Sequence, residues 1–162
     1  MSSHIITGQY ELSIDQMENY YKDLTDNDIK KVFPPLNSIG WLMGHSSVYN
    51  YEIANKIKEI EIPEEANKYR NGQPHSTPDL KDIVSLWENS VLTVKNSLKL
   101  LTDDDLSSKI TWIKDDEEIN FGTDITRMIF HYWNHLGEIA SVRQLLGKNP
   151  GNPGYGSWGW RY

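Results

Sequence analysis

The segment from Ile125 to Leu146 carries apolar residues on two neighbouring stripes, and this pattern restricts the fold more than any other feature. One stripe consists of Ile125, Ile129, Tyr132, Leu136, Ile139 and Leu146. The second consists of Met128, His131, His135, Glu138, Val142 and Leu145. A helix that is apolar on two stripes must pack against neighbours on both sides. The segment therefore predicts a central helix, which opens near Thr123 and Asp124 and ends at Gly147, with its histidines facing inward.

Three earlier segments each show one apolar face with helical spacing. Their inward positions are Ile6, Tyr10, Ile14, Met17, Tyr21 and Leu24 in the first, Ile39, Leu42, Ser46, Tyr49, Ile53, Ile57 and Ile60 in the second, and Leu80, Val84, Trp87, Val91, Val94, Leu98 and Leu101 in the third. The second follows the break at Pro34 and Pro35, and the third has Thr77 as its expected N-cap and Pro78 at its first position. Four such segments predict an all-α protein whose helices pack as a bundle.

The connecting segments are read from their composition. Residues 61–76 are polar with prolines and a glycine, which predicts a surface loop. Residues 109–121 place apolar side chains around an acidic turn, as in a small hairpin. The tail, residues 147–162, is rich in glycine and carries Tyr155, Trp158, Trp160 and Tyr162, an expected aromatic strap over the bundle. No repeat or dividing linker is evident, so residues 1–162 are predicted to form one domain.

Charge and cysteine content exclude several classes of function. The chain has 162 residues, and 16 basic against 23 acidic side chains give a net charge of −7. An acidic surface repels phosphate backbones and anionic lipids, so we expect neither nucleic acid nor membranes as partners. There is no cysteine, which excludes disulfides, thiolate ligands and a cysteine nucleophile. Without an apparent signal peptide or an apolar run long enough to span a bilayer, the expected location is the cytoplasm.

Two inward histidines on the last helix indicate a metal site. His131 and His135 are one helical turn apart, so both imidazoles can reach one cation at about 2.0–2.1 Å. His45 lies on the inward face of the second predicted helix and can supply a third nitrogen. Gly44 and Gly137 are expected to let the two helices approach closely. Three nitrogen ligands leave coordination positions open for water or substrate, as catalytic metal sites require.

The alternative is that these histidines are hydrogen-bonded core residues without a metal. His4, near the N-terminus, and His75, in the polar loop, are not expected as ligands. Other metal patterns fit poorly: H-E-x-x-H would need a glutamate where Tyr132 stands, and di-iron bundles need paired E-x-x-H motifs that the chain lacks. Haem attachment through cysteines is excluded.

Two motifs resemble the DinB/YfiT-like superfamily of metalloenzymes. They are W-L-M-G-H at residues 41–45 and H-Y-W-N-H-L-G-E-I-A-S-V-R-Q-L-L-G at residues 131–147. The stretches T-P-D-L (77–80) and L-T-D-D-D-L (101–106) are also similar to that family. The resemblance covers nearly the whole chain to Gly147 and leaves the aromatic tail outside it. These motifs indicate the superfamily better than any one activity.

The resemblance implies a four-helix bundle with up-down-down-up connectivity, in which a long connection joins the second and third helices. It also implies a divalent metal, zinc or nickel, held by His45, His131 and His135. Characterised members include S-transferases and a maleylpyruvate isomerase that use small thiols such as bacillithiol or mycothiol, and others are described as metal-dependent hydrolases. A small-molecule substrate is therefore expected, and homodimers are common in the superfamily.

Several polar residues near the histidines have two interpretations. Glu138 is the candidate catalytic residue, either accepting a hydrogen bond from a ligand histidine or acting as a base, and otherwise an ordinary carboxylate. Glu52 is a weaker candidate of the same kind, and Tyr49 is either a core residue or a donor in the pocket. Arg143 contacts substrate or forms an ion pair. The chain is thus predicted to be a metal-dependent enzyme, S-transferase-like or hydrolytic, or else a non-catalytic helical bundle that acts as a stress-linked binding protein or an interaction protein.

Overall fold

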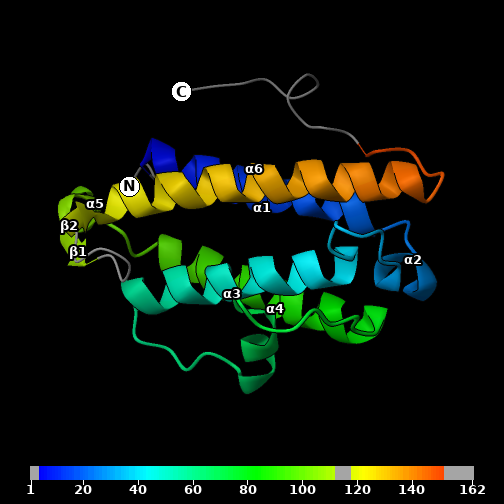
Figure 1. Ribbon diagram of the computed structural model, residues 1–162. Helices are drawn as coiled ribbons and strands as arrows, with labels where there is room; N and C mark the ends of the chain where they lie inside the picture. Colours follow the sequence, from blue (N-terminus) through cyan, green and yellow to red (C-terminus); the bar gives the residue numbers. More distant parts are fainter. Residues whose placement is uncertain (1–3, 112–117, 152–162) are drawn as a thin grey trace.

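Four long helices form the body of the protein. The computed structural model describes residues 4–111 and 118–151, and all further structural statements refer to these residues. The long helices are α1 (Ile5–Tyr21), α3 (Ile39–Ile57), α4 (Leu80–Leu98) and α6 (Phe121–Leu145). They lie side by side as a bundle (Figure 1), which confirms the predicted all-α fold. Its core is lined from all four helices, among others by Tyr10, Ile14, Met17, Leu42, Ile53, Ile83, Trp87, Ile125, Leu136 and Ile139.

Helices α1 and α6 run in the same direction, as Figure 1 shows. The Tyr10 ring on α1 meets the Tyr132 ring on α6 at a centroid distance of 5.7 Å. Further along both helices, Arg143 Nη1 donates to the Tyr20 carbonyl at 2.8 Å. Partner positions therefore advance together along the two helices, as parallel packing requires.

Helix α3 runs against α6 and parallel to α4. Lys56 near the end of α3 pairs with Asp124 near the start of α6 at 2.5 Å. The parallel arrangement of α3 and α4 is fixed by Asn50, which donates to Ser90 at 3.0 Å, and by the start of α3, where Gly40 lies beside Pro78. The connectivity is thus up-down-down-up, and residues 58–79 return the chain to the end of the bundle at which α3 began (Figure 1).

Five short elements lie in the connections: α2 (Asp26–Lys30), η1 (Glu64–Tyr69), α5 (Asp103–Ser107), β1 (Lys109–Thr111) and β2 (Glu118–Asn120). The two strands pair antiparallel with Ile110 opposite Ile119, which confirms the strands of the predicted hairpin. The predicted surface loop at 61–76 is only partly correct, because its 3₁₀ helix buries Ala66 and Tyr69. The polar composition of residues 61–76 gave no indication that these two side chains would be buried.

The bounds of α4 differ from the prediction at its first turn. Asp79, and not Thr77, is the N-cap residue, and its side chain makes no capping hydrogen bond. Instead, Asp79 pairs with Lys30 of α2, and Asp26 of α2 accepts a hydrogen bond from the Leu80 amide at 2.7 Å. A residue distant in sequence therefore satisfies an amide that local capping would otherwise serve.

Helix α6 begins earlier than predicted and ends as predicted. The Asn120 side chain accepts from the Thr123 amide at 2.7 Å, so Asn120 is the N-cap residue. At the other end Gly147 has φ of +73°, and its amide donates to Gln144. The Lys148 amide donates to the Arg143 carbonyl at 2.9 Å, which completes a Schellman motif. The aromatic tail predicted beyond this point falls largely on 152–162, outside the described residues.

Gly44 and Gly137 do not have the role that we expected. A Cβ at Gly44 would lie within 3.0 Å of the Tyr69 ring, so this glycine admits η1 and not α6. A Cβ at Gly137 would meet nothing within 4 Å. The close approach required by the fold is therefore between α3 and the loop segment that follows it, and a small residue at 137 is not needed for helix packing.

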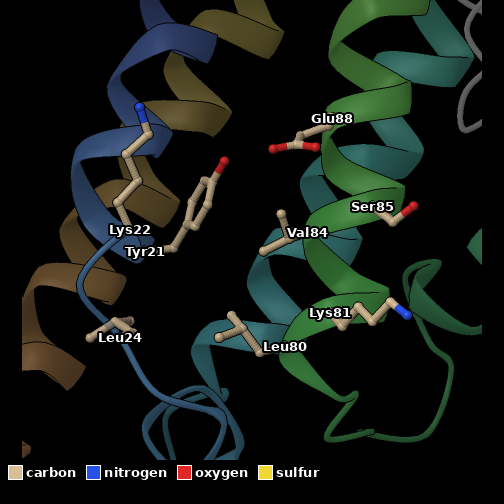
Figure 2. A pocket seen from close by; sticks show the side chains of 8 residues that line it. All are labelled: Tyr21, Lys22, Leu24, Leu80, Lys81, Val84, Ser85 and Glu88. Atoms are coloured by element: carbon tan, nitrogen blue, oxygen red, sulfur yellow. The ribbon is translucent and has the colours of Figure 1, made fainter.

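An open groove lies between the end of α1 and the first half of α4. It has a volume of about 570 Å³. In Figure 2, Tyr21 faces Val84 and Glu88 across this groove. None of its lining residues is a histidine.

Among the described helices, none combines the length and apolar character needed to cross a membrane.

The two glycines form a matched pair for a stability experiment. Gly44→Ala should lower the free energy of unfolding by about 1–3 kcal/mol, because the buried Tyr69 ring must move. Gly137→Ala should raise it by about 0.5–1 kcal/mol, because alanine favours a helix where space is open. Urea denaturation of both variants measures the difference. Equal effects of the same sign would contradict the described packing of Tyr69 on α3.

Candidate metal centre

His45 is held in one orientation by its surroundings on α3. Its Nδ1 atom lies 2.8 Å from the Tyr69 carbonyl oxygen, and because a carbonyl only accepts, Nδ1 carries the proton. The ring also stacks on Trp41 with a centroid distance of 4.6 Å and is 5 % exposed. Nε2 of His45 therefore keeps its lone pair, the form of imidazole that binds a metal.

The structure brings the two histidines of α6 to His45. His131 Nε2 and His135 Nε2 are 2.9 Å apart. The His45 ring lies 5.3 Å from the His131 ring and 5.1 Å from the His135 ring, between centroids. One ligand nitrogen from each residue lies within 4.8 Å of the other two. Two antiparallel helices thus place three imidazoles in one cluster, the arrangement predicted from their inward positions.

Burial keeps this cluster uncharged. Desolvation, with smaller contributions from the neighbouring histidines, lowers the pKa of His131 to about 3. Desolvation and His45 lower the pKa of His135 to about 4, and burial also lowers the pKa of His45. At neutral pH all three rings are neutral. Because His131 Nε2 and His135 Nε2 lie 2.9 Å apart, one of them carries the shared proton, which must move to an Nδ1 atom before both Nε2 atoms can bind a cation.

The donor set fits a divalent first-row metal. Two nitrogens that bind one ion at 2.0–2.1 Å can be at most about 4.2 Å apart. The three nitrogens are spread over up to 4.8 Å, which is above this limit, so the rings must move closer together to bind a single ion. His131 Nδ1 and His135 Nδ1 are buried without a hydrogen-bond partner. Three neutral imidazoles suit zinc, nickel and neighbouring ions, and their chemistry does not select among these.

Glu138 lies behind His135 as seen from the other two histidines. Its Oε2 is 3.7 Å from His135 Nδ1, whereas Nε2 of the same ring points to His131. Its Oε1 accepts from the Asn37 amide at 2.9 Å and from Asn37 Nδ2 at 3.1 Å. The carboxylate is therefore anchored from the loop before α3 and directed at the back of a candidate ligand. Asn37 was not identified from the sequence.

Tyr49 and Glu52 differ in their relation to the cluster. The Tyr49 ring packs edge-on against the His45 and His131 rings, at centroid distances of 4.9 Å and 4.4 Å. Burial, with a contribution from Glu52, raises the pKa of its hydroxyl, which therefore stays protonated. Glu52 itself pairs with Arg70. The Tyr49 ring thus packs against one side of the histidine cluster, and the Glu52 carboxylate is bound by Arg70.

Arg143 is a structural residue in this conformation. The residue is 2 % exposed, and Asp23 accepts from both terminal nitrogens of its side chain at 2.7 Å and 3.0 Å. Tyr20 and Asn149 accept through their carbonyl oxygens at 2.8 Å and 2.7 Å. Of the two interpretations, the structure supports the ion pair, which joins the ends of α1 and α6.

The remaining two histidines lie outside the cluster, as predicted, but both have structural contacts. The His4 side chain caps α1 by accepting from the Ile6 amide at 3.2 Å. His75 Nε2 accepts from the Ser38 amide at 3.1 Å, and its ring stacks on Trp41 at 6.2 Å. His75 therefore packs on the same tryptophan as His45, a contact that a loop position gave no reason to expect.

Comparisons with known proteins agree with this architecture. The family model described as the DinB superfamily matches residues 9–139. The fold is similar to the crystal structure of a conserved protein from Enterococcus faecalis, with a TM-score of 0.61 and 15 % sequence identity. That similarity covers 89 % of this chain and 96 % of the other and shows the fold alone. No curated protein matches the chain.

The buried imidazoles predict how stability depends on pH. An unfolded histidine has a pKa of about 6.5, so between pH 6.5 and 4 the unfolded chain binds more protons than the folded one. The free energy of unfolding of metal-free protein should therefore fall as the pH falls, by at most about 1.4 kcal/mol per pH unit for each histidine. Urea denaturation with a chelator from pH 7.5 to 5.0 measures this slope.

The matched control is the double variant His131→Gln, His135→Gln, which retains every carboxylate of the wild type. Its free energy of unfolding should change less over the same pH range. If both proteins showed the same slope, the two histidines would not be the buried neutral groups described here.

Proposed function

Because the chain belongs to the DinB superfamily, we propose that it is a metal-dependent enzyme in which His45, His131 and His135 hold one divalent cation. The convergence of three neutral imidazoles from two helices, two of them buried and His131 partly buried, carries this proposal. Burying imidazoles without full hydrogen bonding is unfavourable, and a cation that accepts their lone pairs offsets that loss. Zinc or nickel is the proposed ion.

The proposed reaction is attack of a small thiol, or of water, on an electrophilic substrate. A bound divalent cation lowers the pKa of a coordinated water or thiol and so supplies a nucleophile near neutral pH. The chain has no cysteine, so a thiol must arrive as a cosubstrate such as bacillithiol. We favour S-transfer because of the family, with metal-dependent hydrolysis as the alternative.

The chain's own residues prepare this site in three ways. The Tyr69 carbonyl fixes the tautomer of His45, and the Trp41 and Tyr49 rings restrict its rotation. The protonated Tyr49 hydroxyl is a candidate donor to a substrate. Glu138, our candidate catalytic residue, has Oε2 at 3.7 Å from His135 Nδ1; a small approach would let it accept a hydrogen bond from that nitrogen and leave Nε2 to bind, as outer carboxylates do in known metal sites. A small-molecule substrate, a homodimer and a cytoplasmic location remain part of the proposal.

Metal analysis and activity test the proposal together. Protein purified without a histidine tag should contain one ion per chain by elemental analysis, and His45→Ala and His135→Ala should lose it. Both variants should unfold at lower temperature than the metal-loaded wild type, because a ligand of the folded state stabilises it. The metal-loaded wild type should transfer bacillithiol to an electrophilic probe.

His4→Ala is the control, because that residue caps α1 and lies outside the cluster. It should keep the full metal content. A folded wild type that binds no zinc or nickel on addition would favour the non-catalytic bundle. Failure with every small thiol, together with robust ester or amide hydrolysis, would replace the transferase by the hydrolase.

The role of Glu138 has its own matched pair. Glu138→Gln should weaken zinc binding by about 10- to 100-fold, because His135 loses a charged acceptor. Glu52→Gln removes a nearby carboxylate that pairs with Arg70 and should change the affinity less than about twofold. Competition titration with a chromophoric chelator measures both affinities. Equal affinities for the two variants would contradict the assignment of Glu138 to His135.

A further inference from the structure

One buried side chain bonds to all the other long helices of the bundle. Asn50 on α3 is fully buried. Its Oδ1 accepts from the hydroxyls of Tyr10 on α1, at 3.1 Å, and of Tyr132 on α6, at 2.6 Å. Its Nδ2 donates to Ser90 on α4 at 3.0 Å. We call Tyr10, Asn50, Ser90 and Tyr132 the Asn50 network.

The donor and acceptor roles in this network are determined by its outer contacts. The Ser90 hydroxyl donates to the Trp87 carbonyl at 2.7 Å and so accepts from Asn50 Nδ2. The Asn50 oxygen must then face the two tyrosine hydroxyls. Tyr10 and Tyr132 are both fully buried, and each phenol hydroxyl donates to the Asn50 oxygen. A buried network whose orientation is defined in this way is directional, unlike apolar packing.

Members of the Asn50 network lie close in sequence to the three histidines on both α3 and α6, the helices that carry those histidines. Tyr132 follows His131 directly and precedes His135 by three positions, and Asn50 is five positions after His45. The Tyr132 hydroxyl also lies 3.1 Å from the Ser46 carbonyl, next to His45. A slide of α6 along α3 by one residue, about 1.5 Å, would break these bonds.

From this geometry we infer that Tyr132 is a positioning residue, which, through Asn50, sets the register of α6 on α3 and so brings His131 and His135 to His45. The inference rests on the proposed metal function. Metal sites require their ligands to be held within about 0.5 Å of the productive geometry. The hydrogen bond from Tyr132 to Asn50 restricts movement of α6 along α3.

The alternative is that the network contributes only to stability, and Tyr10 provides the control. Tyr10→Phe and Tyr132→Phe each remove one hydroxyl bonded to the same Asn50 oxygen, and both residues are fully buried. The difference is that α6 carries two of the histidines and α1 carries none of the three. A purely structural role predicts similar effects of the two substitutions.

The test measures cobalt binding and the imidazole resonances of each variant. Tyr132→Phe should weaken Co²⁺ affinity by about tenfold or more and change the visible absorption bands of the bound ion. Tyr10→Phe should keep the wild-type affinity within about twofold and the wild-type bands, although it too lowers the unfolding temperature. In metal-free protein, Tyr132→Phe should shift the ring resonances of His131 and His135 more than Tyr10→Phe does.

Two results would overturn the inference: identical affinities and spectra for the two variants, or a larger effect from Tyr10→Phe. If the wild type itself bound no cobalt, the proposed function would fail, and the ring resonances of the metal-free proteins would still decide whether Tyr132 positions the histidines. If Tyr132→Phe did not fold, Asn50→Ser would carry the same comparison against Tyr10→Phe, with the same expected loss of affinity.

Discussion

Desolvation of three imidazoles between α3 and α6 is the constraint on which the site depends. The two helices are antiparallel, and His45 in the first half of α3 meets the histidines around the middle of α6. Burial keeps the rings neutral, and the Tyr69 carbonyl decides which nitrogen of His45 remains able to bind. The fold therefore presents nitrogen lone pairs in a place with little water. Such a place is unfavourable for imidazole alone and favourable for imidazole with a cation.

The rest of the structure can be understood as support for this arrangement. Residues 58–79 return the chain across the bundle, and η1 within them places Tyr69 against Gly44, one residue before His45. The loop before α3 supplies Asn37, which holds Glu138 behind His135. Connections that only join helices in many bundles thus contribute contacts on two sides of the histidine cluster.

Periodicity predicted the helices and the inward positions of the histidines, because both follow from spacing within one helix. It could not predict contacts made across the fold. Asn37 and Glu138 are 101 positions apart, and nothing local in either segment indicates the other. The burial of Tyr69 was not predicted because a single aromatic residue in a polar loop produces no periodic hydrophobic pattern. Gly44 and Gly137 were both given a role in helix approach because each lies close to a candidate histidine in sequence. Only coordinates reveal that Gly44 faces the Tyr69 ring and that the space at Gly137 is open.

X-ray absorption spectroscopy of the untagged, zinc-loaded protein tests the central claim most directly. The account predicts an edge and fine structure fitted by imidazole ligands, three per ion, with zinc–nitrogen distances of about 2.0–2.1 Å. The imidazole contribution should decrease in His45→Ala, the residue contributed by α3. A spectrum with fewer than two imidazoles, or one unchanged by that substitution, would show that the ion binds elsewhere and would contradict the account.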